Sequence, residues 1–201
     1  NNQGVGYLAQ ENYERALWEF KTAAELDPKY AEAHSNKGLV FKVRGQYPEA
    51  IEAFQAAIKA DPKWATPYNH MGGAYLAEKK YEAAIEYFKR AIKIDKEFAD
   101  AYYNLGIAYL ERAPLQKNPK KDKLNAVWAL QRATTHNTRL YNAHLELANT
   151  YRDLGDWEKA ILRYRLAIET KPGDPLPWKK LGELYLEKGD ALKAEEAFAA
   201  A

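Results

Sequence analysis

Small, aromatic and polar residues recur along this chain with a period of 34 residues. Segments 31–64, 65–98 and 141–174 superpose without a gap. In each of them a small residue is followed three places later by a bulky, usually aromatic one. Alanine, a bulky residue and a second alanine come next, before a helix stop. A repeat of this length predicts a stack of helix pairs rather than a closed globule with a pocket.

Each residue type in the repeat has a structural reason. Glycine, as at Gly38, lets a neighbouring helix approach closely, and alanine, as at Ala50, keeps the second helix slim at the same contact. Aromatic side chains such as Tyr75 fill the remaining space. The segment Gly45-Gln46-Tyr47 predicts the turn within a pair. Asp61-Pro62 predicts the end of a second helix, because proline has no N–H to continue it.

The clearest signature lies near the carboxyl end of the chain. Its members follow a fixed spacing, Trp178, Leu181, Gly182, Tyr185, Ala194 and Phe198. This spacing resembles the tetratricopeptide repeat, and the resemblance extends over essentially the whole chain. It implies an all-α fold, a right-handed α-solenoid of stacked antiparallel helix pairs. It also implies a concave groove, lined by the first helix of each pair, that binds an extended peptide or a partner helix.

The register divides the chain into six units within one solenoid domain, residues 1–201. The units are 1–30 (partial), 31–64, 65–98, 99–140, 141–174 and 175–201 (partial). Neither end shows the polar face that a terminal solenoid helix needs for solubility. We therefore expect the chain to be part of a longer protein.

The fourth unit contains eight extra residues between its two helices. The stretch from Pro114 to Lys123 has two prolines, which predict a loop, and four lysines against one aspartate. Its net charge of +3 leaves about −1 for the rest of the chain, given the total of +2. One hypothesis is a basic loop that contacts an acidic partner, an anionic lipid surface or a nucleic acid, through Lys117, Lys120, Lys121 and Lys123. The other is a solvated loop that the fold tolerates. On either hypothesis, we expect removal of residues 115–122 to leave the fold intact.

The resemblance also indicates which positions face the groove. Asparagine or histidine occupies the sixth place of the first four units, at Asn2, Asn36, His70 and Asn104. An asparagine side chain can bond both the N–H and the C=O of an extended peptide. This row is similar to the asparagine ladder of the nucleocytoplasmic glycosyltransferase that modifies serine and threonine with N-acetylglucosamine. The alternative is that these side chains only bond neighbouring helices. The predicted groove residues are Asn36, Leu39, Asn69, His70, Tyr103, Asn104, Ile107, Asn149 and Arg152.

The carboxylate clamp of heat-shock co-chaperones needs lysine and asparagine at the fifth and ninth places of one unit. Those places hold Ser35 and Leu39, Asn69 and Gly73, Tyr103 and Ile107, and Leu145 and Asn149. The clamp is therefore absent from this chain.

Composition excludes several other classes of function. A net charge of +2 does not suit a nucleic-acid-binding surface, and the absence of cysteine removes disulfides and thiolate sites. No run of eighteen apolar residues is present, so no membrane span is expected. The four histidines fall in distant units, and no catalytic or phosphate-binding motif appears. We expect no enzymatic activity, no cofactor and no metal.

These observations favour a non-enzymatic scaffold that binds a protein or peptide partner in its groove, as part of a multiprotein complex. One alternative is a substrate-recognition or regulatory arm of a larger enzyme, such as a glycosyltransferase. A third option is homo-oligomerisation by stacking of the uncapped ends. We expect a soluble protein, with the cytoplasm favoured over an envelope compartment.

Overall fold

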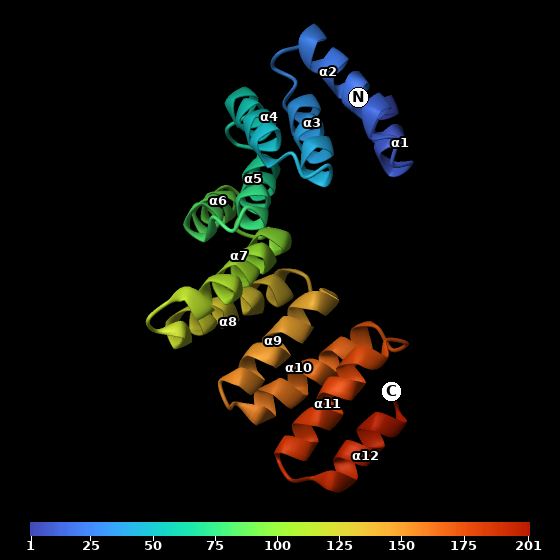
Figure 1. Cartoon of the computed structure of the whole chain (residues 1–201), viewed down its shortest axis with the longest axis vertical. Coiled ribbons are helices and arrows are strands. Elements are labelled where there is room, and N and C mark those ends of the chain that lie inside the picture. Colours follow the sequence, from blue (N-terminus) through green and yellow to red (C-terminus); the bar gives the residue numbers. More distant parts are fainter. The chain divides into compact units, whose positions relative to one another are not determined.

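The computed structural model describes residues 1–201, which form twelve α-helices, one 3-10 helix and no strand (Figure 1). The helices pack in successive pairs, so the predicted all-α solenoid fold is confirmed. The chain divides into two compact units, Asn1–Asn104 and Leu105–Ala201, and the division falls inside one helix, α7.

The helix bounds follow the sequence repeat. The first unit contains α1 (Asn2–Ala9), α2 (Tyr13–Leu26), α3 (Ala31–Val43), α4 (Tyr47–Ala60), α5 (Ala65–Ala77), α6 (Tyr81–Ile94) and the start of α7 (Ala99–Arg112). The second contains the rest of α7, η1 (Ala113–Leu115), α8 (Pro119–His136), α9 (Tyr141–Asp153), α10 (Trp157–Thr170), α11 (Pro175–Glu187) and α12 (Ala191–Ala199). Odd-numbered helices are the first helices of the repeats, and even-numbered helices are the second.

Glycine in five of the six first helices makes room for a bulky side chain from the second helix of the same pair. A Cβ atom placed on Gly38 would lie 2.5 Å from the ring of Phe54, which is fully buried. The same contact recurs at Gly4 with Phe20, Gly72 with Phe88, Gly182 with Phe198, and Gly106 with Leu130. The close approach inferred from the glycine pattern is therefore a contact between backbone and side chain within one pair.

The turn within a pair needs one residue in the left-handed region. Gly45, Gly155 and Gly189 supply it, with φ between +73° and +79°. Glu11 and Lys79 adopt the same conformation with φ of 56° and 59°. A side chain at this place carries a steric penalty that glycine avoids.

The turn between pairs is built by side chains that bond the backbone. The Asp61 carboxylate accepts from the Lys63 N–H at 2.9 Å, and Asp27 and Asp95 make the same bond. Histidine side chains bond two of these turns. His34 Nε2 donates to the Pro28 carbonyl after α2, and His144 Nε2 donates to the Thr138 carbonyl after α8, both at 3.0 Å. These two histidines therefore have a structural role in the turns.

The basic insertion is not the loop that its prolines predict. Only residues 116–118 lie outside helical structure, because η1 covers Ala113–Leu115 and α8 begins at Pro119. Proline suits the first turn of a helix, where its missing N–H has no intrahelical partner. The second helix α8 is 18 residues long, whereas α4 has 14, so much of the insertion extends α8. Lys120, Lys121 and Lys123 therefore stand on a helix.

One acidic residue ties the insertion to the core. Asp122 is buried and accepts from Arg112 Nε at 2.8 Å and Nη2 at 2.9 Å. Lys123 pairs with Asp153 at 2.6 Å, while Lys117, Lys120 and Lys121 are exposed. The expectation that residues 115–122 are dispensable for folding is inconsistent with this arrangement, because their removal would leave Arg112 without its buried partner.

Candidate functional site

The first helices of consecutive repeats are joined by hydrogen bonds between polar side chains 35 residues apart. In the first compact unit, Asn1–Asn104, each bond joins the sixth-place residue of one repeat to the fifth-place residue of the repeat before it. We call these bonds cross-repeat rungs. The rungs are Asn36 Nδ2 to Asn1 Oδ1 at 3.2 Å, His70 Nδ1 with Ser35 Oγ at 3.3 Å, and Asn104 Nδ2 to Asn69 Oδ1 at 3.0 Å.

The rungs show that the predicted asparagine row bonds neighbouring helices. They do not use all of its hydrogen-bonding capacity. Asn104 is half-buried and donates one N–H to Asn69, which leaves its second N–H and its own carbonyl oxygen. Asn36 is in the same situation. Asn69 is 7% exposed and therefore acts chiefly by fixing the orientation of Asn104.

His70 is held as a neutral ring within this row. Its ring packs against Phe54, with the centroids 5.5 Å apart. Burial, helped by the nearby charge of Lys42, lowers the pKa of His70 from 6.5 to about 4. A neutral imidazole keeps one acceptor and one donor nitrogen at physiological pH.

The apolar residues predicted beside the amides are only partly exposed. Leu39 packs against the buried cluster around Phe54 and Met71, and part of its side chain remains accessible. Tyr103 is half-buried on α7 in the first unit. Ile107 is half-buried in the second unit. We call the exposed surface of the first helices within a compact unit, with its amides and apolar side chains, the first-helix face of that unit.

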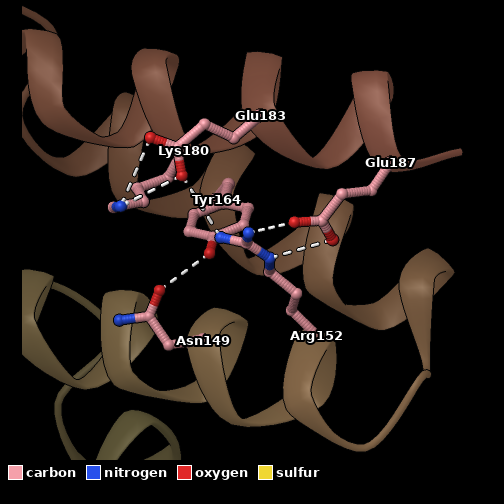
Figure 2. Close-up of polar contacts among 6 residues, drawn as sticks. All are labelled: Asn149, Arg152, Tyr164, Lys180, Glu183 and Glu187. Carbon is pink, nitrogen blue, oxygen red and sulfur yellow. Dashed lines mark hydrogen bonds and ion pairs between the residues drawn. The ribbon is translucent and has the colours of Figure 1, made fainter.

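In the second unit, the predicted residues Asn149 and Arg152 are bonded to other side chains (Figure 2). Tyr164 donates its hydroxyl to Asn149 Oδ1 at 2.7 Å. Arg152 donates through Nε to Glu187 Oε2 at 3.1 Å, with a second contact from Nη2 to Glu187, and through Nη1 to Glu183 at 3.3 Å. These bonds raise the pKa of Arg152. The arginine charge is thus balanced within the protein.

Sequence reasoning gave little weight to two residues that shape the first-helix face. Lys42 lies beside His70, and its ammonium group lies against Gly73 of α5. The available signal was the twelfth place of the repeat, where Lys42 and Arg152 interrupt a row of leucines. That signal becomes informative only when the neighbouring helix is known.

The second unit also has a pocket of about 530 Å³ between α11 and α12, lined by Trp178, Leu181, Tyr185, Ala197 and six other residues. No three His, Asp or Glu side chains are grouped so that they could hold a metal ion. No helix has both the length and the apolar character that crossing a bilayer requires.

Comparison with known proteins agrees with the repeat geometry. Residues 1–63 match a tetratricopeptide repeat family, and residues 72–112 and 148–189 match a TPR repeat family. The crystal structure of MamA has 31% sequence identity and a TM-score of 0.70, covering 81% of this chain and 91% of MamA. The chain belongs to the tetratricopeptide repeat family.

Two further structures resemble this tetratricopeptide repeat protein in fold. PilF of Pseudomonas aeruginosa has 23% identity and a TM-score of 0.83, covering 98% of this chain and 86% of PilF. YrrB, described as a TPR protein with an unusual peptide-binding site, has 23% identity and a TM-score of 0.69, covering 90% of this chain and 89% of YrrB. Among curated proteins there is no significant match.

Proposed function

We propose that this protein is a non-catalytic interaction scaffold that binds an extended peptide or protein segment on its first-helix face, within a multiprotein complex. Membership of a family whose repeats generally mediate protein interactions supports the scaffold role. The peptide-binding site named for YrrB supports a peptide as the partner, although its 23% identity makes the likeness one of fold.

The observation that carries this proposal is the partial use of the asparagine amides. The rung to Asn69 fixes the side chain of Asn104, while one N–H and the carbonyl oxygen remain for a ligand. An amide fixed in this way loses little conformational entropy when it bonds a peptide backbone. Repetition of the rung on successive helices suits a ligand whose own backbone is extended, because its polar groups also recur along one line.

The remaining residues of the face have complementary parts in the proposal. In the first unit, Leu39 and Tyr103 would give apolar contact to side chains of the bound segment, and in the second unit Ile107 offers an apolar side chain of the same kind. Asn149 and Arg152 would contribute in the second unit only by exchanging their present partners, Tyr164 and the two glutamates. We therefore place the main binding energy on the first unit.

The test is the double variant Asn36→Ala with Asn104→Ala, measured against peptides selected on the unmodified protein from a randomised display library. We expect at least a tenfold loss of affinity, since each alanine replaces an amide that would bond the ligand. Gln55→Ala is the matched control, because it removes an exposed amide from the second helix α4. Circular dichroism checks that helicity is retained. Unchanged affinity in a folded double variant would reject the first-helix face as the binding surface.

A further inference from the structure

Lys42 occupies the twelfth place of its repeat, where most of the other repeats have leucine. The twelfth-place leucines are Leu8, Leu76, Leu110 and Leu186. Lys42 is half-buried, and its Nζ would lie 3.1 Å from a Cβ atom built on Gly73 of α5. The ammonium group therefore extends from α3 across the first helix of the next repeat.

Arg152 is the other cation at the twelfth place. There, two glutamates of the protein balance the charge. Its carboxylate partners come from the next repeat, Glu183 at the ninth place and Glu187 at the thirteenth (Figure 2). The equivalent residues opposite Lys42 are Gly73 and Ala77, neither of which carries a charge. The two sites thus share one geometry, and only the one at Arg152 contains its counter-charge.

Neither α3 nor α5 places a carboxylate close to Lys42, and Glu78, which directly follows α5, pairs with Lys80 at 3.2 Å. Helix α5 contains no aspartate or glutamate. The only acidic residue of α3 is Glu32, ten positions before Lys42, which corresponds to about 15 Å along a helix axis. Burial lowers the pKa of Lys42, with no charged group offsetting that effect. Lys42 also lowers the pKa of the adjacent His70, which is neutral at physiological pH and so provides no counter-charge.

A half-buried ammonium without a counter-charge is a costly feature, and an incoming carboxylate would relieve it. The charge-assisted hydrogen bond between the two groups is stronger than a neutral one, and the partial burial protects it from screening. Because Gly73 has no side chain, the ammonium group of Lys42 can lie against the backbone of α5. A single lysine is a point charge and lacks the fork of arginine that favours phosphate.

We propose that Lys42 anchors an aspartate or glutamate side chain of the segment bound by the first-helix face, an inference that rests on the proposed function. Cross-repeat rungs lie on both sides of Lys42, at Asn36 and at Asn104. Because amides that would bond the peptide backbone lie on both sides of Lys42, the acidic residue would lie inside the bound segment rather than at its carboxyl terminus. This subsite differs from the carboxylate clamp, whose lysines stand at other places of the repeat.

The sharpest test supplies the missing counter-charge within the protein. Ala77→Glu places a carboxylate 35 positions after Lys42, as Glu187 stands after Arg152, and Ala77 is exposed on α5. Ala77→Gln is the control of equal size without charge. Both variants and the unmodified protein are screened against a randomised nonapeptide library with amidated carboxyl termini. The best peptide is then synthesised together with versions in which each acidic residue is replaced by its amide.

We expect peptides enriched on the unmodified protein to share one acidic residue. Replacing it by its amide, or introducing Ala77→Glu, should each weaken binding about tenfold, with no further loss when both are combined. Ala77→Gln should bind normally. Enriched peptides that lack an acidic preference, or that bind Ala77→Glu as tightly, overturn the Lys42 subsite and leave the peptide-binding face in place. A library that yields no peptide overturns the face and the subsite together.

Discussion

The Arg112 guanidinium holds the buried Asp122 carboxylate with two hydrogen bonds, from Nε at 2.8 Å and from Nη2 at 2.9 Å. The side chain of Asp122 is only 5% exposed, so its loss would strand a partly buried cation. We expect Asp122→Ala to lower the free energy of unfolding by about 3 kcal/mol. Urea denaturation measures the change. Lys121→Ala, on the exposed neighbouring residue, should shift stability by no more than about 0.5 kcal/mol.

The same pair predicts the effect of shortening the insertion. Deleting residues 115–122 returns the fourth repeat, residues 99–140, to the ordinary length of 34 residues but removes Asp122. We expect this deletion to destabilise the protein at least as much as Asp122→Ala does, and adding Arg112→Met to the deletion to recover part of the loss. Thermal melting of the three variants makes the comparison. A deletion variant as stable as the parent would mean that the ion pair contributes nothing to folding.

The contact between Gly38 and Phe54 predicts a position-specific cost of adding one methyl group. Gly38→Ala would place a Cβ atom 2.5 Å from the Phe54 ring, which is fully buried and cannot move aside freely. We expect a loss of about 1–3 kcal/mol in the free energy of unfolding. Gly6→Ala is the control, because nothing lies within 4 Å of the new methyl group on helix α1. That variant should be neutral or stabilising by up to about 1 kcal/mol.

The turns within helix pairs contain a position that can be improved. Lys79 has a φ of 59° at a place where Gly45, Gly155 and Gly189 stand in other repeats. We expect Lys79→Gly to stabilise the protein by about 0.5–1 kcal/mol, and Gly45→Ala to destabilise it by a similar amount. Denaturation curves of both variants test the pair of expectations. A loss of stability in Lys79→Gly would show that its side chain makes a contact that outweighs the backbone strain.

Much of the fold could be predicted because the repeat assigns a residue type to each structural task. Gly38, Ala50 and Phe54 identify the contact within a pair, and Asp61-Pro62 identifies the end of α4. The insertion was misjudged because proline is ambiguous in sequence. Pro119 breaks a continuing helix but also favours the first turn of a new one. In the structure Pro119 takes the second role, as the first residue of α8.

The candidate site could be predicted only in part. Spacing identified Asn36, His70 and Asn104 as a row, because equal places in successive repeats lie on successive first helices. It could not say which of their hydrogen bonds are used, since that depends on contacts 35 residues away. For the same reason, spacing could not show that Arg152 has carboxylate partners within the protein whereas Lys42 does not. Both are cations at the same place, and the difference lies in the residues opposite them.

His70 makes stability depend on pH in a defined window. Its pKa is lowered from 6.5 in the unfolded chain to about 4 in the fold, mainly by burial and also by Lys42. Between these values the unfolded chain binds a proton that the folded protein does not, so stability falls as the pH drops from about 6.5 to 4. Above that window both states are neutral at this residue, and His70 adds no pH dependence.

The size of this effect can be isolated with His70→Gln, whose amide can still bond Ser35 but does not titrate. We expect the wild-type protein to lose about 2 kcal/mol more stability than the variant between pH 7 and pH 4.5, by order of magnitude. Denaturation at both pH values gives the difference, and comparison with the variant cancels the contributions of other titrating groups such as His144, whose pKa burial also lowers. NMR titration of the His70 ring provides an independent check. A midpoint near 6.5, together with parallel stability losses in both proteins, would place the ring in water rather than against Phe54.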